Sequence, residues 1–299
     1  MFWEKRLQKA MDRAYPIEFD DSSKFILFSD VHRGVNDWSD DFAQNQLLFF
    51  HALTHYLSEN YTYIELGDGD ELWENKYFRD IREAHSHIFW LLSKFYQQKR
   101  FHLIYGNHDI ERQWERKVRK TLFTFRDEKE KKVNELFKDI KVYESILLRH
   151  KRSEKTILLL HGHQADCVSG ILWRFSRCMV RHFWKHLQLL GFNDPTSPAK
   201  NYRRANKVER HLMQWVTDKK QFLIAGHTHR SRIPMNPAVP FFNTGSCVHP
   251  RCITGLEIAD GQISLIKWWV RMSDDPQCDC LQVKKDLILS PQKLEFYWK

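Results

Sequence analysis

The sequence has no long apolar run, little glycine or proline, and few cysteines. No apolar stretch approaches the roughly 20 residues that a bilayer-spanning helix needs. The first residues, MFWEKRLQKAMDRAYP, carry charges where the apolar part of a signal peptide would lie. With 11 Gly and 9 Pro in 299 residues, the chain is not of a low-complexity or collagen-like type. We therefore expect a folded cytoplasmic protein, with any membrane contact peripheral and on the inner face.

The six cysteines follow no zinc-ribbon spacing and do not suggest a secreted disulfide framework. They stand at Cys167, Cys178, Cys247, Cys252, Cys278 and Cys280. We expect reduced thiols, and the role of the closely spaced Cys278 and Cys280 stays open.

Basic residues outnumber acidic ones, 47 Lys and Arg against 38 Asp and Glu, which gives a formal net charge of +9. This balance favours an anionic partner: a phosphate-rich substrate, nucleic acid or an anionic membrane surface. At the start of the chain, Phe2, Trp3, Leu7, Met11 and Ala14 fall near one helical face. We expect a helix that packs on the domain, with a membrane-surface helix as the alternative.

Short apolar runs recur along the chain, and polar residues follow each of them. The runs at 24–29, 61–66, 101–105, 156–160 and 222–225 read as buried strands. They are followed by Asp30-x-His32, Gly67-Asp68, Gly106-Asn107-His108-Asp109, His161-Gly162-His163 and Gly226-His227-Thr228-His229. Helical spacing occurs at 42–58, 77–97 and 110–137, and extended segments at 241–270 suggest a second sheet. The pattern predicts an α/β protein with a ligand site at the carboxyl ends of its strands.

Residues 165–220 interrupt this alternation of strands and helices. They are rich in large apolar and basic residues, and we interpret them as a helical cap inserted over the site. In this interpretation the Arg and Lys residues would bind phosphates. The alternative is a pair of amphipathic helices with a core face and a solvated face.

The polar residues after the strands offer carboxylate, imidazole and amide ligands. This mixed oxygen and nitrogen set suits Mn, Fe, Zn or Co. Two such cations about 3.5–4 Å apart need one carboxylate that bridges them. A pair of divalent ions activates water and neutralises phosphoryl oxygens, so the pattern indicates hydrolysis of a phosphate ester or anhydride.

These motifs, in this order across residues 30–229, resemble those of the calcineurin-like metallophosphoesterase superfamily. They read DVH, GDGDE, GNHD, HGH and GHTH. The resemblance implies a four-layer α/β/β/α sandwich forming one domain over residues 1–299, with the cap inserted at about 165–220. It also implies two divalent metal ions, with Mn favoured and Fe or Zn as alternatives.

The resemblance also implies a role for each motif residue. Asp30, His32 and His229 would hold one metal, Asp68 would bridge, and Asn107, His161 and His227 would hold the other. His108 would stabilise the phosphate or protonate the leaving group, and Asp109 would orient it. The second acidic residue of the family's GD motif could match Asp70 or Glu71, and the role of His163 is open.

Two segments narrow the resemblance to UDP-2,3-diacylglucosamine diphosphatases. They are GDGDELWE and GHTHR with the later NTG, although Ser246-Cys247 departs from that pattern. The implied substrate is a phosphate-containing small molecule or a lipid-linked nucleotide such as UDP-2,3-diacylglucosamine. Candidate substrate contacts are Arg33, Asn201, Arg203, Arg204 and Arg230. The alternatives are a phosphodiesterase or nuclease, a protein phosphatase, and, least favoured, a non-catalytic scaffold; nucleic acid is the less favoured partner.

Overall fold

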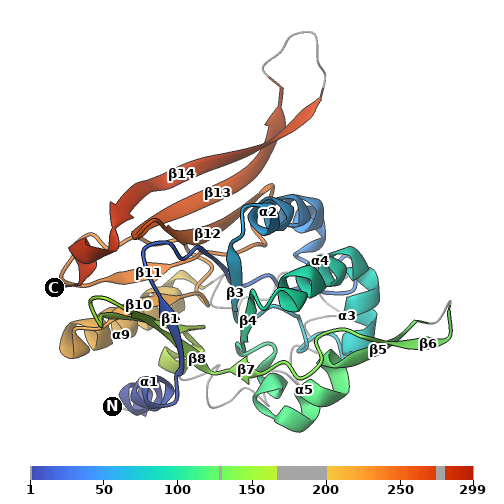
Figure 1. Ribbon diagram of the computed structural model, residues 1–299, viewed down its shortest axis with the longest axis horizontal. Helices are drawn as coiled ribbons and strands as arrows, with labels where there is room; N and C mark the ends of the chain where they lie inside the picture. Colours follow the sequence, from blue (N-terminus) through green and yellow to red (C-terminus); the bar gives the residue numbers. More distant parts are fainter. Residues whose placement is uncertain (1, 128–129, 167–200, 274–279, 299) are drawn as a thin grey trace.

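The computed structural model describes residues 2–127, 130–166, 201–273 and 280–298. Two β-sheets form the centre of the molecule, and helices cover the outer face of each (Figure 1). This arrangement confirms the expected α/β class and the four-layer α/β/β/α order.

The larger sheet has seven strands in the order β14-β13-β12-β2-β3-β4-β7. Strands β2, β3, β4 and β7 run parallel to one another, whereas β12, β13 and β14 are joined antiparallel to the edge at β2. The strands are β2 (Phe25–Phe28), β3 (Thr62–Leu66), β4 (Phe101–Ile104), β7 (Val142–Tyr143), β12 (Cys252–Ala259), β13 (Gln262–Met272) and β14 (Leu281–Lys293).

The smaller sheet has five strands in the order β1-β8-β9-β10-β11. Only the pair of β8 and β9 is antiparallel, and the other pairs are parallel. The strands are β1 (Tyr15–Phe19), β8 (Ser145–His150), β9 (Thr156–Leu160), β10 (Phe222–Ala225) and β11 (Phe241–Asn243).

Helices of two groups cover the sheets. The larger sheet is covered by α2 (Gln46–Ser58), α3 (Phe78–Ala84), α4 (Ser86–Gln97) and α5 (Glu115–Leu122), and the smaller by α1 (Phe2–Asp12) and α9 (Tyr202–Lys219). A hairpin of β5 (Thr124–Asp127) and β6 (Lys132–Glu135) follows α5. Single 3-10 turns are η1 (Ala43–Asn45), η2 (Ile110–Gln113), η3 (His163–Ala165) and η5 (Leu294–Tyr297).

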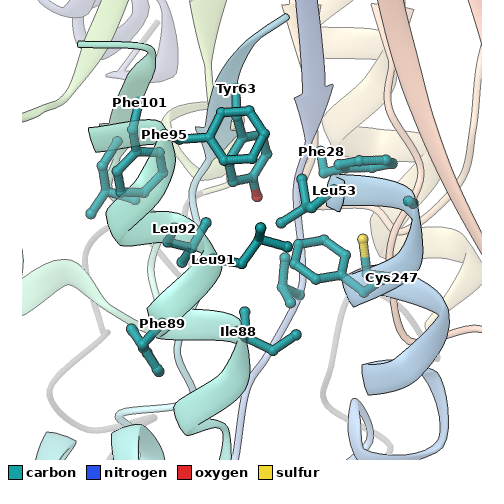
Figure 2. Packing of buried hydrophobic residues seen from close by; sticks show 14 of the residues in the cluster. Phe28, Leu53, Tyr63, Ile88, Phe89, Leu91, Leu92, Phe95, Phe101 and Cys247 are labelled. Atoms are coloured by element: carbon teal, nitrogen blue, oxygen red, sulfur yellow. The ribbon is translucent and has the colours of Figure 1, made fainter. Parts of the chain in front are cut away.

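Alternation along the strands divides the core between layers. In β2, Phe25 and Leu27 point into the space between the sheets, whereas Ile26 and Phe28 point to the helices. Figure 2 shows Phe28 close to side chains of α2 and α4. Because side chains alternate with a period of two, a wholly apolar strand of this kind is buried on both faces. The strands are therefore fixed in register, and their carboxyl ends meet at one edge.

Each of the five strands expected before a polar motif is present within a residue or two of its expected limits. The helix at 42–58 is confirmed as η1 and α2, and 77–97 forms two helices that meet at His85. The expectation of one helix over 110–137 is wrong, because α5 ends at Leu122 and the chain then forms a hairpin. Phe125 and Val133 fitted a helical spacing but lie on that hairpin.

Two further expectations change with the tertiary structure. The segment 241–270 forms no separate sheet: β11 joins the smaller sheet, while β12 and β13 extend the larger one. The second half of the expected cap is helix α9, but its face of Val208, Leu212 and Trp215 packs on the smaller sheet with α1. It is a helix of the outer layer. Residues 167–200 of the expected cap lie outside the described residues.

The N-terminal helix packs on the domain as expected, with Trp3, Leu7 and Ala10 buried. Within the described residues, no helix has the length and apolar character needed to cross a membrane. Cys247 and Cys252 are free thiols. Cys280 is disulfide-bonded, so the expectation of reduced thiols is wrong for that residue.

Candidate metal centre

Two buried carboxylates from neighbouring strands stand at the middle of the candidate site. Asp30 follows β2 and Asp68 follows β3, and both are at most 1 % exposed. His229 Nε2 lies 3.1 Å from Asp30 Oδ1, and His161 Nε2 lies 3.0 Å from Asp68 Oδ2. His32 Nε2 lies between them, 3.9 Å from Asp30 Oδ1 and 3.8 Å from Asp68 Oδ2. The site thus joins residues from both sheets.

The potential ligands fall into groups that match the two expected sets. Asp30, His32 and His229 form one, and Asp68, His161 and His227 form another; within each, the ligand atoms lie within 4.8 Å of one another. The remaining expected ligand, Asn107, is 1 % exposed and follows β4 at the same edge of the sheet. A third group, His32, Glu71 and His108, adjoins the first through the shared His32.

Asn107 Oδ1 is buried with no hydrogen-bond partner in the described part of the chain. A buried polar atom without a partner costs about 1–3 kcal/mol, so folded proteins rarely leave one unpaired. Asp30 Oδ1 and His161 Nε2 are also buried, and each contacts another expected ligand, His229 at 3.1 Å and Asp68 at 3.0 Å. Two divalent cations would engage all three atoms, because each is an oxygen or nitrogen ligand of the kind such ions bind. The residues present therefore fit a metal site.

The backbone at the site adopts the left-handed conformation at most of the expected ligands. The φ angles of Asp30, His32, Asp68, His227 and His229 lie between +51° and +70°. Each such residue costs of order 1–3 kcal/mol of strain and persists only where its surroundings fix it. Such strain is typical of functional sites. It directs these side chains toward the site, which a relaxed loop conformation would not do.

Two glycines let the strand ends approach closely. A Cβ at Gly106 would lie 2.1 Å from Asp68 Oδ1, and one at Gly226 would lie 2.6 Å from Asp30 Oδ2. No larger residue fits at either place unless the carboxylates move. The glycine of GNHD and the glycine of GHTH are therefore required by the packing of the site.

His108 is held by Glu71 and not, as expected, by Asp109. Its Nδ1 lies 2.8 Å from Glu71 Oε1, and its ring stacks on Trp73 with centroids 4.2 Å apart. The other oxygen of Glu71 lies 2.8 Å from His32 Nδ1. Burial opposes ionisation of Glu71, but the His108 and His32 imidazoles hold the pKa of its carboxyl well below the ordinary value. Glu71, the second acidic position of the GD motif, is thus an ionised group that orients two imidazoles.

Asp109 instead fixes the backbone of two loops. Its carboxylate accepts hydrogen bonds from the amides of Gly106, at 2.6 Å, and Gly69, at 3.1 Å. Burial, together with the nearby charge of Asp68, raises the pKa of Asp109 to about 7. The role expected for Asp109, orientation of the His108 ring, is therefore corrected to the placement of the loops after β3 and β4.

Arg33 is not a substrate contact, because it is 1 % exposed and fully engaged by acids. Its guanidinium donates to Glu65 at 2.7 and 2.8 Å and to Asp70 at 2.6 Å. Arg112, which is 4 % exposed, pairs with Asp70 and Asp109. These buried ion pairs tie together the loops that carry the motifs.

The other four candidate substrate contacts lie at or beside the first turns of α9 and after the GHTH motif. Asn201 caps α9 by accepting a hydrogen bond from the Arg204 amide at 3.1 Å. Arg203 lines a pocket of about 350 Å³ with Asn201 and Arg204. Arg230 donates to Asn206 and lies over the ring of Tyr202. Their contact with substrate stays a prediction.

Asp166 is a site residue that the sequence did not reveal. Its Oδ2 lies 3.1 Å from His227 Nε2 and accepts from the Arg204 guanidinium at 2.6 Å. Burial opposes ionisation, but His227 and Arg204 hold the pKa of Asp166 below its ordinary value, so the carboxylate accepts and His227 Nε2 donates. The Nδ1 lone pair of His227 is thereby left for a ligand bond. The only sequence signal was an acidic residue three positions after His163.

His163, whose role was open, is buried beside His161, with ring centroids 5.6 Å apart. Burial and the neighbouring His161 hold the pKa of His163 well below its ordinary value, so the ring is neutral. Its Nδ1 has no hydrogen-bond partner among the described residues.

Comparison with known proteins identifies the family of this chain. The calcineurin-like phosphoesterase family matches residues 23–231. The chain belongs to the calcineurin-like phosphoesterase family. Among solved structures it is similar to Vps29 of Chaetomium thermophilum, with 11% sequence identity, 91% of this chain and 100% of that chain covered, and a TM-score of 0.38. No curated protein matches the chain.

Proposed function

We propose that this protein is a dinuclear metal-dependent phosphohydrolase that cleaves a phosphoester or pyrophosphate bond. The observation that carries the proposal is the convergence of buried carboxylate and imidazole ligand atoms around Asp30 and Asp68. Membership of a phosphoesterase family supports it. A scaffold that had lost catalysis would not need to bury these carboxylates and imidazoles together, because buried polar groups are costly.

In this proposal Asp30, His32 and His229 would hold one ion, and Asn107, His161 and His227 would hold the other. Asp68 would bind both, which its position supports: its Oδ2 lies 3.0 Å from His161 Nε2 and 3.8 Å from His32 Nε2, one histidine from each set. When bound, a pair of divalent ions lowers the pKa of water and neutralises phosphoryl oxygens. Mn is the first ion to test, with Fe and Zn as alternatives.

The chain's own residues supply the proton for the leaving group. Glu71 receives the Nδ1 proton of His108, and Trp73 holds the plane of the ring. His108 Nε2 has no partner in the described part of the chain, so it is the atom that can reach substrate. We assign to it protonation of the leaving oxygen, a step that typically contributes 10²–10⁴-fold, as an order of magnitude.

The substrate class is an organic phosphate monoester, diester or diphosphate. The GDGDELWE and GHTHR segments favour a nucleotide-linked lipid such as UDP-2,3-diacylglucosamine, and peripheral contact with a membrane belongs to this reading. Arg203, Arg204 and Arg230 stay candidate contacts for such a substrate. A nuclease or a protein phosphatase would use the same metal chemistry on another substrate.

The test is a hydrolysis panel with Mn-supplemented protein and a chelator control. It sets bis(p-nitrophenyl) phosphate and p-nitrophenyl phosphate beside UDP-2,3-diacylglucosamine, a simple nucleotide sugar and a single-stranded oligonucleotide. We expect metal-dependent turnover that is abolished in Asp68→Ala while the circular dichroism spectrum is unchanged. Arg152→Ala, an exposed substitution away from the site, is the control.

Each outcome decides a different part of the proposal. Preference for the acylated diphosphate supports the lipid substrate, and preference for the oligonucleotide replaces it with a nuclease. Turnover of small esters alone leaves the metal chemistry in place and removes the lipid. Absence of metal-dependent turnover on every substrate, with metal bound, would overturn the hydrolase proposal.

A further inference from the structure

A large basic pocket lies beside the candidate metal centre and has no part in the proposed metal chemistry. Its volume is about 530 Å³, and its walls come from α3, α5 and β5. In Figure 1 these elements stand together near the end of β4. Of the 14 described residues that line it, seven are Lys or Arg and one, Glu111, is acidic. Such an excess of one sign within a concave wall focuses a positive potential on whatever enters.

The cations that line the pocket differ in whether they pair with a carboxylate. Two of them do: Arg82 is 3.4 Å from Glu83, and Lys117 is 3.8 Å from Glu111. In contrast, Lys76, Lys120 and Arg126 make no ion pair within the described residues and are exposed at the rim. Three uncompensated positive charges around one cavity repel each other, and a multiply charged anion would relieve that repulsion.

The pocket also has an aromatic lining. The Arg82 guanidinium lies 4.3 Å from the centroid of the Phe125 ring. Stacking of this kind holds the guanidinium plane in place, so less conformational entropy is lost when it binds an anion. The lining therefore suits the phosphate of an organic molecule better than a bare, strongly hydrated anion.

The pocket shares its inner wall with the loops of the metal centre. Leu72, which lines the pocket, directly follows Glu71, whose carboxylate orients His108. Arg112, also in the wall, pairs with Asp109 of the motif after β4. The pocket and the metal centre are therefore built on the same two loops, those after β3 and β4.

We propose that this pocket is a second anion subsite that binds a remote phosphate of the substrate while another phosphate is hydrolysed at the metal centre. The proposal rests on the proposed function for the position of the scissile bond, but not for the binding itself. It selects substrates with two or more phosphates, or with a phosphate and a further anionic group, over simple monoesters. It gives the pocket its own affinity for a diphosphate when the metal centre is empty.

The test uses the variant Lys120→Ala/Arg126→Ala, which removes two exposed rim cations. The matched control is Arg152→Ala/Lys155→Ala, which removes the same charge from the turn between β8 and β9. Binding of inorganic pyrophosphate and of UDP is measured by calorimetry on full-length protein with a chelator present. We expect the rim variant to bind both about tenfold more weakly than the wild type and the control, a change of about 1.4 kcal/mol in binding free energy.

Hydrolysis of bis(p-nitrophenyl) phosphate is measured on the same proteins. The rim variant should retain the wild-type rate, because this single phosphate does not reach the pocket. If the wild type did not hydrolyse this ester, the result would count against the proposed hydrolase activity and not against the subsite. Equal pyrophosphate affinity in the rim variant and the control would overturn the subsite. The subsite proposal would also be overturned if a single-stranded oligonucleotide bound the wild type more tightly than UDP and did not bind the rim variant. The pocket would then serve nucleic acid.

Discussion

At the scale of single residues, Glu71 is the group on which the proposed proton transfer depends. It lies 2.8 Å from both the His108 and the His32 rings. In the sequence, Asp70 and Glu71 are both candidates for the second acidic position of the GD motif. The tertiary structure decides between them. Asp70 turns to Arg33 and Arg112, whereas Glu71 turns to the site.

Replacing Glu71 by Gln should therefore lower turnover with little change in fold. Without the carboxylate, the His108 ring loses the acceptor that fixes its orientation. We expect kcat on bis(p-nitrophenyl) phosphate to fall by about 10²-fold. Steady-state kinetics and metal analysis are the measurements. If Asp109 oriented the ring, Asp109→Asn would lower kcat more than Glu71→Gln does. That result would show our assignment to be wrong.

Asp166 acts on the metal centre through His227. Its carboxylate fixes which ring nitrogen of His227 carries the proton. Asp166→Asn should weaken metal binding by about 10–100-fold, as loss of such partners of ligand histidines typically does. A calorimetric titration with Mn measures the affinity. Arg204→Ala is the companion variant: it keeps the carboxylate, so an equal loss of affinity there would mean that Asp166 serves only to anchor α9.

At the scale of elements, buried ion pairs join the loops after β2, β3 and β4. Arg33 connects Glu65 of β3 with Asp70 of the following loop, and both acids are fully buried. Burial alone opposes ionisation of Glu65, but the charge of Arg33 holds the pKa of that carboxyl below its ordinary value. The pairs therefore position the motif loops relative to one another.

Arg33→Ala should destabilise the protein strongly, because it leaves the buried Glu65 carboxylate without its cation and removes one of the two cations that pair with Asp70. The expected loss in free energy of unfolding is about 3–5 kcal/mol. Urea denaturation followed by fluorescence measures it. Arg152→Ala, whose side chain is 75% exposed, should change stability by about 0–1 kcal/mol. A comparable small change for Arg33→Ala would show that the network carries no stability.

The packing of the elements explains why two sequence patterns led to wrong predictions. Val118, Leu122 and Phe125 have helical spacing, but only the first two lie on α5, because Phe125 belongs to a hairpin strand that packs on the larger sheet's helices. Helix α9 looked like part of a cap because its basic residues are many. Its apolar stripe meets the smaller sheet, and a stripe in the sequence does not say which surface it will meet.

At the scale of the whole molecule, bound metal should stabilise the folded state. The expected ligands come from five loops of two sheets, and they come together only in the folded chain. An ion that binds only the folded state adds about 2.7 kcal/mol when its concentration is a hundred times its dissociation constant.

We expect Mn to raise the melting temperature of chelated protein by several degrees, as measured by scanning calorimetry. Asp30→Asn/Asp68→Asn should abolish that shift while remaining folded, since both substitutions keep the volume of the side chain. An unchanged melting temperature in the wild type, with Mn shown to be absent from the protein, would contradict the proposed metal centre.

The sequence by itself determined the chemistry at the strand ends. Short apolar runs such as those of β2 and β9 are typical of buried strands, and a polar group that directly follows such a strand lies at the edge of the sheet. Asp30, Asp68 and the paired histidines could therefore be recognised one strand at a time, because each signal is local.

Only the tertiary structure decided which side chains meet. Glu71 bonds to His108, Arg33 turns away into an ion pair, and Asp166 reaches His227 across 61 positions. The basic pocket likewise combines α3, α5 and β5, which no spacing relates. Such partners depend on how layers pack and how loops turn. A linear sequence records the identity of each group, whereas the direction in which it points is set by contacts distant along the chain.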